Sequence, residues 1–212
     1  MIHKVNIALH VVTGTIGLLV GIVTLLLYRR SKEHKHWGRY FLYLLSVVVV
    51  TGFAGWLFFR SNSFLLMLTL VSGYVGYAGY RTIQLREKKG TWIDALIAVA
   101  ALGIATGYVA SLQHGQWSPA VIYSTLAALL LVTSYDLLKF FWLHNRIKSW
   151  WRYEHIYKMI SAFSAMLSAF TGTVLPNLKP FSQIGPSIFC TALIIFFIIQ
   201  QSKHNTKIKQ GG

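Results

Sequence analysis

Acidic residues are the scarcest charged residues in this chain. Only five of its 212 residues are Asp or Glu, against 20 Lys and Arg, and the formal net charge is +15. So few carboxylates leave little material for the paired acid and base on which hydrolases rely. The sequence also lacks an HExxH or Cys-rich zinc spacing, a Gly-x-Ser-x-Gly nucleophile elbow and a lysine between residues 184 and 199. These absences argue against the common hydrolases and against a retinal Schiff base of the rhodopsin type.

Cysteine and proline are also rare. Cys190 is the only cysteine, so an internal disulfide is excluded, and we expect its thiol to act as a small hydrophobic group. Proline is tolerated before a helix and in its first turn. The prolines are therefore compatible with long helices, because all four stand before or at the start of apolar runs, at Pro119, Pro176, Pro180 and Pro186.

Apolar side chains dominate what remains. They make up 55% of the chain, whereas charged residues make up only 12%. A soluble domain of this size has too little interior to bury so many, but lipid covers the outside of a polytopic membrane protein. The basic residues stand in short clusters between apolar runs, so we attribute the net charge to membrane topology and expect no nucleic-acid partner. We expect a single integral membrane domain that spans residues 1–212.

Seven apolar segments reach the roughly 20 residues that a helix needs to cross a hydrocarbon core of about 30 Å. The sequence therefore predicts an all-α polytopic membrane protein with seven transmembrane helices. The first segment is longer than a signal-peptide core, so we expect it to remain as an uncleaved anchor. The predicted helices cover approximately residues 5–28, 38–59, 64–85, 92–113, 119–142, 156–175 and 184–201.

Lys and Arg lie almost entirely at one set of predicted helix ends. Seventeen of the 20 fall there, and the exceptions are Lys4, Arg60 and Lys179. Cytoplasmic ends of membrane proteins carry the excess of Lys and Arg, so this distribution predicts an N-terminus outside and a C-terminus in the cytoplasm. We expect a multi-pass protein of the bacterial cytoplasmic (inner) membrane whose basic ends contact anionic lipid headgroups.

Two predicted helices carry a histidine above a row of small residues on one face. In each helix the four positions are separated by four, three and four residues, and this spacing places them on a single face. Because the two helices run in opposite directions, both histidines are predicted near the outer ends. The positions are His10, Gly14, Gly17 and Gly21 in the first helix and Gly103, Gly107, Ala110 and His114 in the fourth.

Paired imidazoles from two facing helices are the ligand set of a bis-histidine b-type haem. We therefore interpret His10 and His114 as candidate ligands of a haem iron, with the small residues giving the macrocycle room. His36 and His155 stand near the inner ends of the second and sixth helices and form a weaker second pair. The alternative is that the small residues only allow close helix packing in lipid, with the histidines hydrogen-bonded in the interfacial region.

Asp136 lies inside the predicted fifth span. A carboxylate within the membrane is a candidate for proton or ion handling, and the alternative is an ion pair with Lys139 or a neighbouring basic residue of the following loop. Tyrosines at Tyr74, Tyr77 and Tyr80 recur every third residue in the third helix. They are candidates for a polar wall beside a solute path, and alternatively they fill gaps between helices. We expect Asp94 to complement the N-terminus of the fourth helix.

Several short motifs resemble an uncharacterised family of small bacterial polytopic membrane proteins, a domain of unknown function. A weaker similarity is to the ascorbate-reducible transmembrane b-type cytochromes, which implies haem-binding roles for His10, His36, His114 and His155. The motifs that carry the family resemblance are His10-Val-Val-Thr-Gly14, His36-Trp37-Gly38-Arg39-Tyr40, Gly79-Tyr80-Arg81 with Asp94, and His155 with Met159.

Three functions follow from these patterns. The first is transmembrane electron transfer through b-type haem, with quinone as a candidate partner and a membrane oxidoreductase as the only enzyme class we consider. The second is transport of a small solute, ion or proton that uses Asp136 and the third-helix tyrosines. The third is a non-catalytic assembly subunit, and a homodimer would let the two grooves of small residues face each other across subunits.

Overall fold

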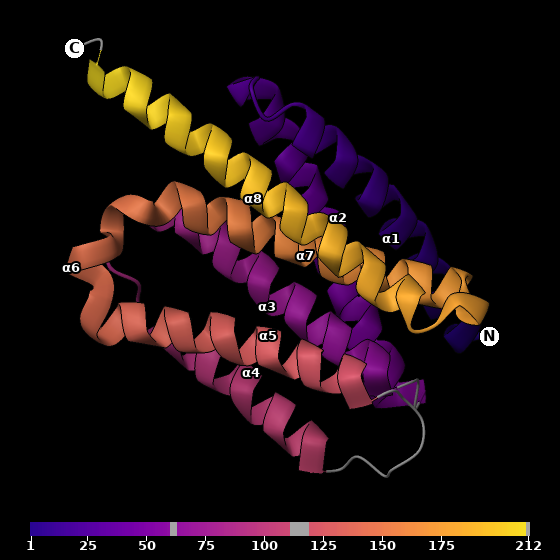
Figure 1. Ribbon diagram of the computed structural model, residues 1–212. Helices are drawn as coiled ribbons and strands as arrows, with labels where there is room; N and C mark the ends of the chain where they lie inside the picture. The colour runs from indigo at the N-terminus through magenta and orange to yellow at the C-terminus, as the bar shows by residue number, and fades with distance from the viewer. Residues whose placement is uncertain (60–62, 111–118, 211–212) are drawn as a thin grey trace.

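The chain folds into a bundle of long helices (Figure 1). The computed structural model describes the backbone of residues 1–59, 63–110 and 119–210 and the side chains of residues 1–59, 66–107 and 123–203. Within these residues all regular elements are helical, which confirms the all-α prediction. The long helices are α1 (Ile2–Leu26), α2 (Ser31–Phe59), α3 (Ser63–Leu85), α4 (Trp92–Ala110), α5 (Pro119–Leu138), α7 (Trp151–Val174) and α8 (Phe181–Gln210).

Each predicted apolar segment coincides with one of these helices, but several helices extend past the apolar residues. α2 begins at Ser31 rather than near residue 38, and α8 continues to Gln210 instead of ending near residue 201. The added turns are basic and polar, because backbone hydrogen bonding does not stop where hydropathy changes. The basic connection after α5 is also helical, with a π-helical turn at Lys139–Leu143, α6 at His144–Ile147 and a 3₁₀ turn at Lys148–Trp150.

Within the described residues, four helical stretches are long and apolar enough to cross a membrane. They are Ile2–Leu26, Ser31–Phe59, Tyr123–Val174 and Phe181–Lys203, and a shorter apolar helix covers Trp92–Gly107. Large apolar side chains such as Leu131, 70% exposed, and Ile188, 67% exposed, lie on the outside of the bundle. Such side chains are costly in water and favourable in lipid. The chain therefore has the character of a membrane protein.

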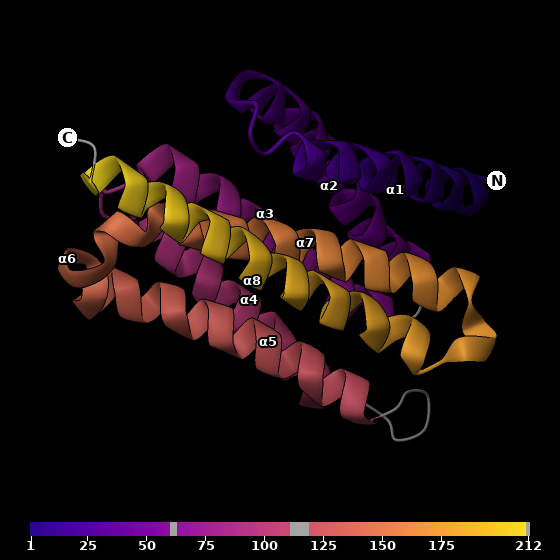
Figure 2. The same cartoon turned by 45° about the horizontal axis from the view of Figure 1, so that its top comes forward.

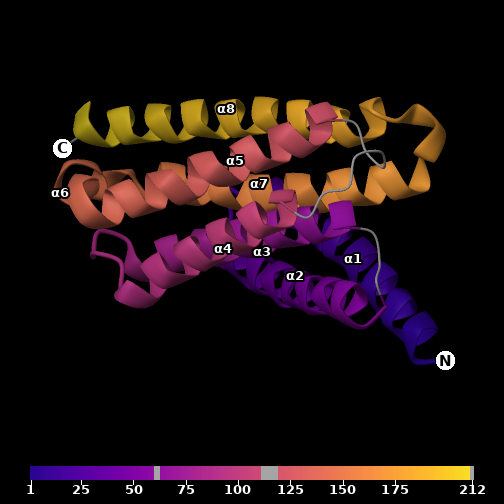
Figure 3. The ribbon, with the colours of Figure 1, turned by 90° about the horizontal axis from the view of Figure 1, so that it is seen from below.

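The centre of the bundle is the pair α3 and α7. Figure 2 shows the α1–α2 pair and the α4–α5 pair on opposite sides of this centre, and Figure 3 shows α8 running along α7. Small residues let α3 and α7 approach closely: a Cβ added to Gly79 would lie 2.8 Å from Sδ of Met159 and 3.2 Å from Cβ of Lys158. Close approach through small residues is how helices gain packing energy in lipid.

The buried side chains form two clusters that share α7. One lies among α3, α4, α5 and α7 and contains the fully buried Met67, Val75 and Leu129. The other lies among α1, α2, α7 and α8 and contains Phe163 and Cys190. Cys190 is 1% exposed and packs as a small hydrophobic residue, as the sequence predicts. Together the clusters hold α7 in register with both flanking pairs, and this positions the polar groups that α7 carries.

Candidate functional site

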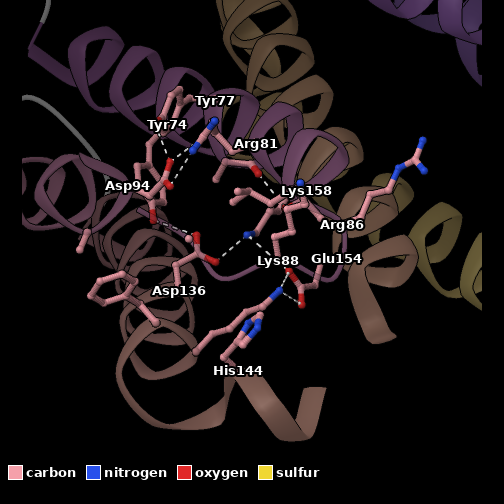
Figure 4. A pocket seen from close by; sticks show the side chains of 17 residues that line it. Tyr74, Tyr77, Arg81, Arg86, Lys88, Asp94, Asp136, His144, Glu154 and Lys158 are labelled. Carbon is pink, nitrogen blue, oxygen red and sulfur yellow. Dashed lines mark hydrogen bonds and ion pairs between the residues drawn. The ribbon is translucent and has the colours of Figure 1, made fainter. Parts of the chain in front are cut away.

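Three of the five acidic residues converge at one end of the bundle. There α3 and α5 end and α4 and α7 begin, so the connectivity brings four helix ends together. Asp94 comes from the first turn of α4, Asp136 from the last turn of α5 and Glu154 from the first turn of α7. Figure 4 shows these carboxylates with their cationic partners around a common cavity. Such a concentration of a rare residue type marks this end as the candidate site.

Asp136 is held between a tyrosine and a lysine. The Tyr74 hydroxyl donates a hydrogen bond of 2.8 Å to Oδ2, and Nζ of Lys158 lies 2.5 Å from Oδ1. The Lys158 side chain is 4% exposed and that of Asp136 is 18% exposed, so water screens the pair weakly. An ion pair with a basic residue was one of the two sequence-based interpretations, but the partner is Lys158 of α7 rather than Lys139 of its own helix.

Glu154 forms the second ion pair of the site. Nζ of Lys139 lies 2.6 Å from both of its carboxylate oxygens, and the Tyr135 hydroxyl donates to Oε1 at 2.8 Å. Nζ of Lys158 lies 4.0 Å from the other oxygen, Oε2, one helical turn along α7. Figure 4 shows Lys158 between Asp136 and Glu154, in reach of both carboxylates. One ammonium group therefore connects two anionic positions.

Asp94 forms the third ion pair and also caps α4. The Arg81 guanidinium donates to its two oxygens at 2.6 and 2.9 Å, and the Tyr77 hydroxyl donates at 2.7 Å. The backbone N–H and the hydroxyl of Thr91 donate to Oδ2 at 2.7 and 2.8 Å. The predicted role at the helix N-terminus is confirmed, and in addition the residue joins α3 to α4. Of the three tyrosines, Tyr74 and Tyr77 face this network, whereas Tyr80 is exposed and accepts a hydrogen bond from Gln84.

These ion pairs line a cavity of about 70 Å³, which is large enough for several water molecules. Arg86, Lys88 and His144 also line it, so cations outnumber carboxylates at its wall. Burial lowers the pKa of His144, and the nearby lysines Lys139 and Lys148 lower it further. The cavity can therefore hold water next to Asp136 while its surrounding charge favours anionic over protonated groups.

Further polar residues, here called the polar row, lie along α7 beyond this cavity. Lys158, Ser164 and Ser168 are buried and Thr171 is half-buried. Ser168 and Ser187 of α8 place their hydroxyl oxygens 3.4 Å apart. Lys158 and Thr171 are 13 positions apart, about 20 Å along the helix. The sequence analysis did not select these residues, because serine is common on packed membrane helices. The spacing of the serines along α7 was the only signal in the sequence.

His10, one histidine of the first predicted pair, contacts α2, the neighbouring helix of its own hairpin. Nδ1 of His10 lies 2.8 Å from the Thr51 hydroxyl of α2. The small residues below it are packing positions: a Cβ on Gly14 would meet Val48, one on Gly17 would meet Met166, and one on Gly21 would lie 2.7 Å from the Phe163 ring. The groove of α1 is thus filled by α2 and α7.

The proposed partner helix lies on the other side of the bundle. α4 packs against α3 and α5, whereas α1 packs against α2 and α7. His114 lies outside the described residues. Gly107 is exposed, and a Cβ on it or on Gly103 would meet nothing within 4 Å. Within one chain, the described parts of the two stripes therefore do not face each other.

The second predicted pair is also separated. The ring of His36 contacts Trp37 and Tyr40. Nδ1 of His155 lies 3.3 Å from the carbonyl oxygen of Gly79, and its ring faces His34, with centroids 6.4 Å apart. His34 in turn places Nδ1 2.9 Å from the carbonyl oxygen of Thr24. The structure thus brings His155 beside His34.

Comparisons with known proteins leave the site to be interpreted from its geometry. No family model, curated protein or solved structure matches the chain. Among the described side chains, no group of three or more His, Cys, Asp or Glu residues is arranged to hold a metal ion. The buried ion pairs and the polar row of α7 are therefore the features from which a function is argued.

Proposed function

We propose that this chain is a seven-span protein of the bacterial inner membrane that moves a proton or small ion across the bilayer along α7. Its N-terminus is outside and the charged cavity opens toward the cytoplasm. The seven apolar segments and the placement of 17 of the 20 Lys and Arg at one set of ends support this topology. The same basic ends meet anionic headgroups.

The observation that carries the proposal is the buried polar row that leads from the cavity along α7. The row begins at Lys158, next to Asp136, and its distant members Ser168 and Thr171 contact α8. Ionisable side chains such as Lys158 and Asp136 are expensive inside a bilayer and often mark an ion or proton path. At Lys158 and Asp136, apolar side chains would serve assembly at least as well as a buried ion pair.

Lys158 gives this path a physical mechanism. Its ammonium group lies 2.5 Å from Asp136 and 4.0 Å from Glu154. When Asp136 takes up a proton from water in the cavity, its carboxyl group loses its charge and no longer attracts Lys158. The ammonium group of Lys158 then moves toward Glu154. Leaving a buried charge unpaired costs several kcal/mol, roughly 3–5, so the movement of Lys158 is coupled to the charge of Asp136. Tyr74 donates to the ionised carboxylate and stabilises the starting state.

Electron transfer through b-type haem remains a prediction of the sequence and is not part of this proposal. The haem prediction requires His10 to face α4 and His36 to face His155. The described contacts instead bind His10 to Thr51 and place His155 beside His34. No contact described in the structure favours a quinone site.

Proton flux into liposomes tests the proposal. Purified protein is reconstituted with a pH-sensitive dye inside, and a potassium diffusion potential, negative inside, draws protons in. We expect faster acidification than in protein-free liposomes, and a return to the protein-free rate for Asp136→Asn. Glu33→Gln removes an exposed carboxylate outside the cavity and serves as the matched control. Equal rates with and without protein, or an unchanged rate in Asp136→Asn, overturn the proposal.

A further inference from the structure

His144 has a buried ring nitrogen whose hydrogen-bonding capacity is unused. Nδ1 of His144 is closed off from solvent and has no hydrogen-bond partner among the residues whose side chains are described. The residue lines the charged cavity, and Figure 4 shows its ring near Glu154. Buried polar atoms without a partner are rare in folded proteins, and each one needs an explanation. A group that enters the cavity and bonds to this nitrogen would supply one.

The charges that act on His144 are mainly positive. Burial lowers its pKa, and the ammonium groups of Lys139, Lys148 and Lys89 lower it further, whereas the carboxylate of Glu154 raises it. Glu154 cannot balance the three lysines, because both of its oxygens already lie 2.6 Å from Nζ of Lys139. The unused ring nitrogen therefore faces a part of the cavity where the protein's own field favours a negative charge.

Another cation of the cavity wall is also without a carboxylate. Each of the three carboxylates there is paired with one cation, as Arg81–Asp94, Lys139–Glu154 and Lys158–Asp136. Lys88 lines the same cavity and forms no ion pair within the described part of the chain. Arg86 differs, because Figure 4 shows its guanidinium directed away from the cavity, where it lies 5.9 Å from the centre of the Trp151 ring. Lys88 therefore adds an unmatched positive charge to the wall.

These groups together make a set of hydrogen-bond donors without acceptors. An ammonium group has three N–H donors, and the two oxygens of Glu154 use two of those on Lys139. The third N–H of Lys139, the ammonium of Lys88 and the His144 ring remain. A nearby anion favours the protonated imidazole ring, in which both nitrogens donate. Several donors around a small volume suit a phosphate group, because its oxygens accept strong charge-assisted hydrogen bonds. The cavity of about 70 Å³ limits the ligand to a small anionic group.

The cavity also lies where phosphate groups are abundant. Trp92 and Trp142 are 68% and 74% exposed, and the Trp92 ring lies 5.0 Å from that of Phe140, which lines the cavity. Exposed tryptophans gather at the headgroup level of a bilayer, and basic side chains there attract anionic lipids. A phosphate group can therefore reach the cavity from a phospholipid headgroup or as free inorganic phosphate.

We propose that the charged cavity binds a phosphate group through His144, Lys88 and the third N–H of Lys139. Regulation of transport by this anion rests on the proposed function: a phosphate that draws Lys139 from Glu154 leaves this carboxylate free to attract Lys158. Binding itself requires no transport. A binding experiment in detergent, with no gradient across a membrane, can therefore fail or succeed independently of the proton-flux experiment.

Thermal unfolding of the full chain in a maltoside detergent tests the site. At neutral pH, the midpoint is measured in rising sodium phosphate, with sodium chloride holding the ionic strength constant. A second series compares short-chain phosphatidylglycerol with short-chain phosphatidylcholine, whose choline neutralises its phosphate. We expect a saturating rise with phosphatidylglycerol, inorganic phosphate or both, and no rise with phosphatidylcholine. A rise with inorganic phosphate alone assigns the site to the free anion, whereas a rise with phosphatidylglycerol assigns it to a lipid headgroup.

Two substitutions separate binding from packing. His144→Phe and Lys88→Met should each weaken the apparent affinity about tenfold or more, the effect of losing one hydrogen bond to a charged group. In chloride alone both variants should unfold at the temperature of the unchanged chain or above it, because one removes an unsatisfied buried nitrogen and the other a charge from a positive field.

Lys35→Met is the matched control, because Lys35 is an exposed lysine of α2 that does not line the cavity. This variant should keep the full response. The site does not exist if neither phosphate source raises the midpoint of the unchanged chain, or if either His144→Phe or Lys88→Met keeps the full response. An equal loss of response in Lys35→Met would show that the basic surface as a whole attracts the anion, and would overturn the proposal as well.

Discussion

The ammonium group of Lys158 lies 2.5 Å from Oδ1 of Asp136, a residue 22 positions earlier in the chain. This pair connects α5 to α7 at the end of the bundle where the charged cavity lies. Lys158 is also the point from which the polar row of α7 departs. The same contact therefore fixes the register of two helices and supplies the mobile charge of the proposed path.

Removal of one member of this pair should cost far more stability than removal of both. Lys158→Met leaves the half-buried Asp136 with the neutral Tyr74 as its described partner, so we expect a loss of about 3–5 kcal/mol. The double variant Lys158→Met with Asp136→Leu has no buried charge left unpaired and should recover most of this loss. Chemical unfolding in detergent measures the cycle. Additive losses would show that the two side chains do not interact.

The two stripes of small residues should respond differently to a single methyl group. In Gly21→Ala the new Cβ would lie 2.7 Å from the rigid ring of Phe163, so we expect a loss of about 1–3 kcal/mol from overpacking. In Gly107→Ala the new Cβ meets no described atom within 4 Å, and the change should be neutral or slightly stabilising. Thermal unfolding compares the two variants. A destabilising Gly107→Ala would instead place α4 against a second copy of the chain.

The positions of the helices follow from the sequence because hydropathy and the length of a span are local properties. Each predicted segment, such as 64–85, coincides with a helix, α3. The helix ends at Ser31 and Gln210 cannot be predicted from hydropathy, because helical hydrogen bonding continues into the polar flanks. The number of helices that cross the bilayer is a separate question, and four stretches of the described chain have the length and hydropathy that crossing needs.

The site follows from the sequence only in part. Asp136, Tyr74 and Tyr77 can be selected because charged and hydroxyl groups are costly in a span. Their partners depend on how α5 and α7 are rotated, which the π-helical turn at Lys139–Leu143 alters by one residue. The same limit applies to histidine: His34 and His36 point about 200° apart on a helix, and only the packing of α2 shows that His34 is the one beside His155.

His144 should make the protein less stable at acidic pH. Its pKa is lowered in the folded chain by burial and by nearby lysines, so the unfolded chain binds a proton more readily. Stability contributed by this residue is therefore complete above the ordinary histidine pKa of about 6.5 and falls as the pH drops below it. His144→Gln should reduce the loss of thermal stability between about pH 7 and about pH 5. An identical pH dependence in both proteins would contradict the assignment.

The absorption spectrum distinguishes the proposed ion path from the haem prediction. The contacts of His10 with Thr51 and of His155 with the Gly79 carbonyl occupy one nitrogen of each ring and hold the rings within packed helices. We therefore expect protein purified from cells supplied with haem precursors to show no Soret band. The measurement is made on the unchanged chain and on His10→Ala and His155→Ala. A Soret band that either substitution removes would identify a haem ligand and restore electron transfer as the leading function. A band that survives both would locate the haem at other residues, and in either case the proton-flux experiment would decide whether the α7 row conducts ions as well.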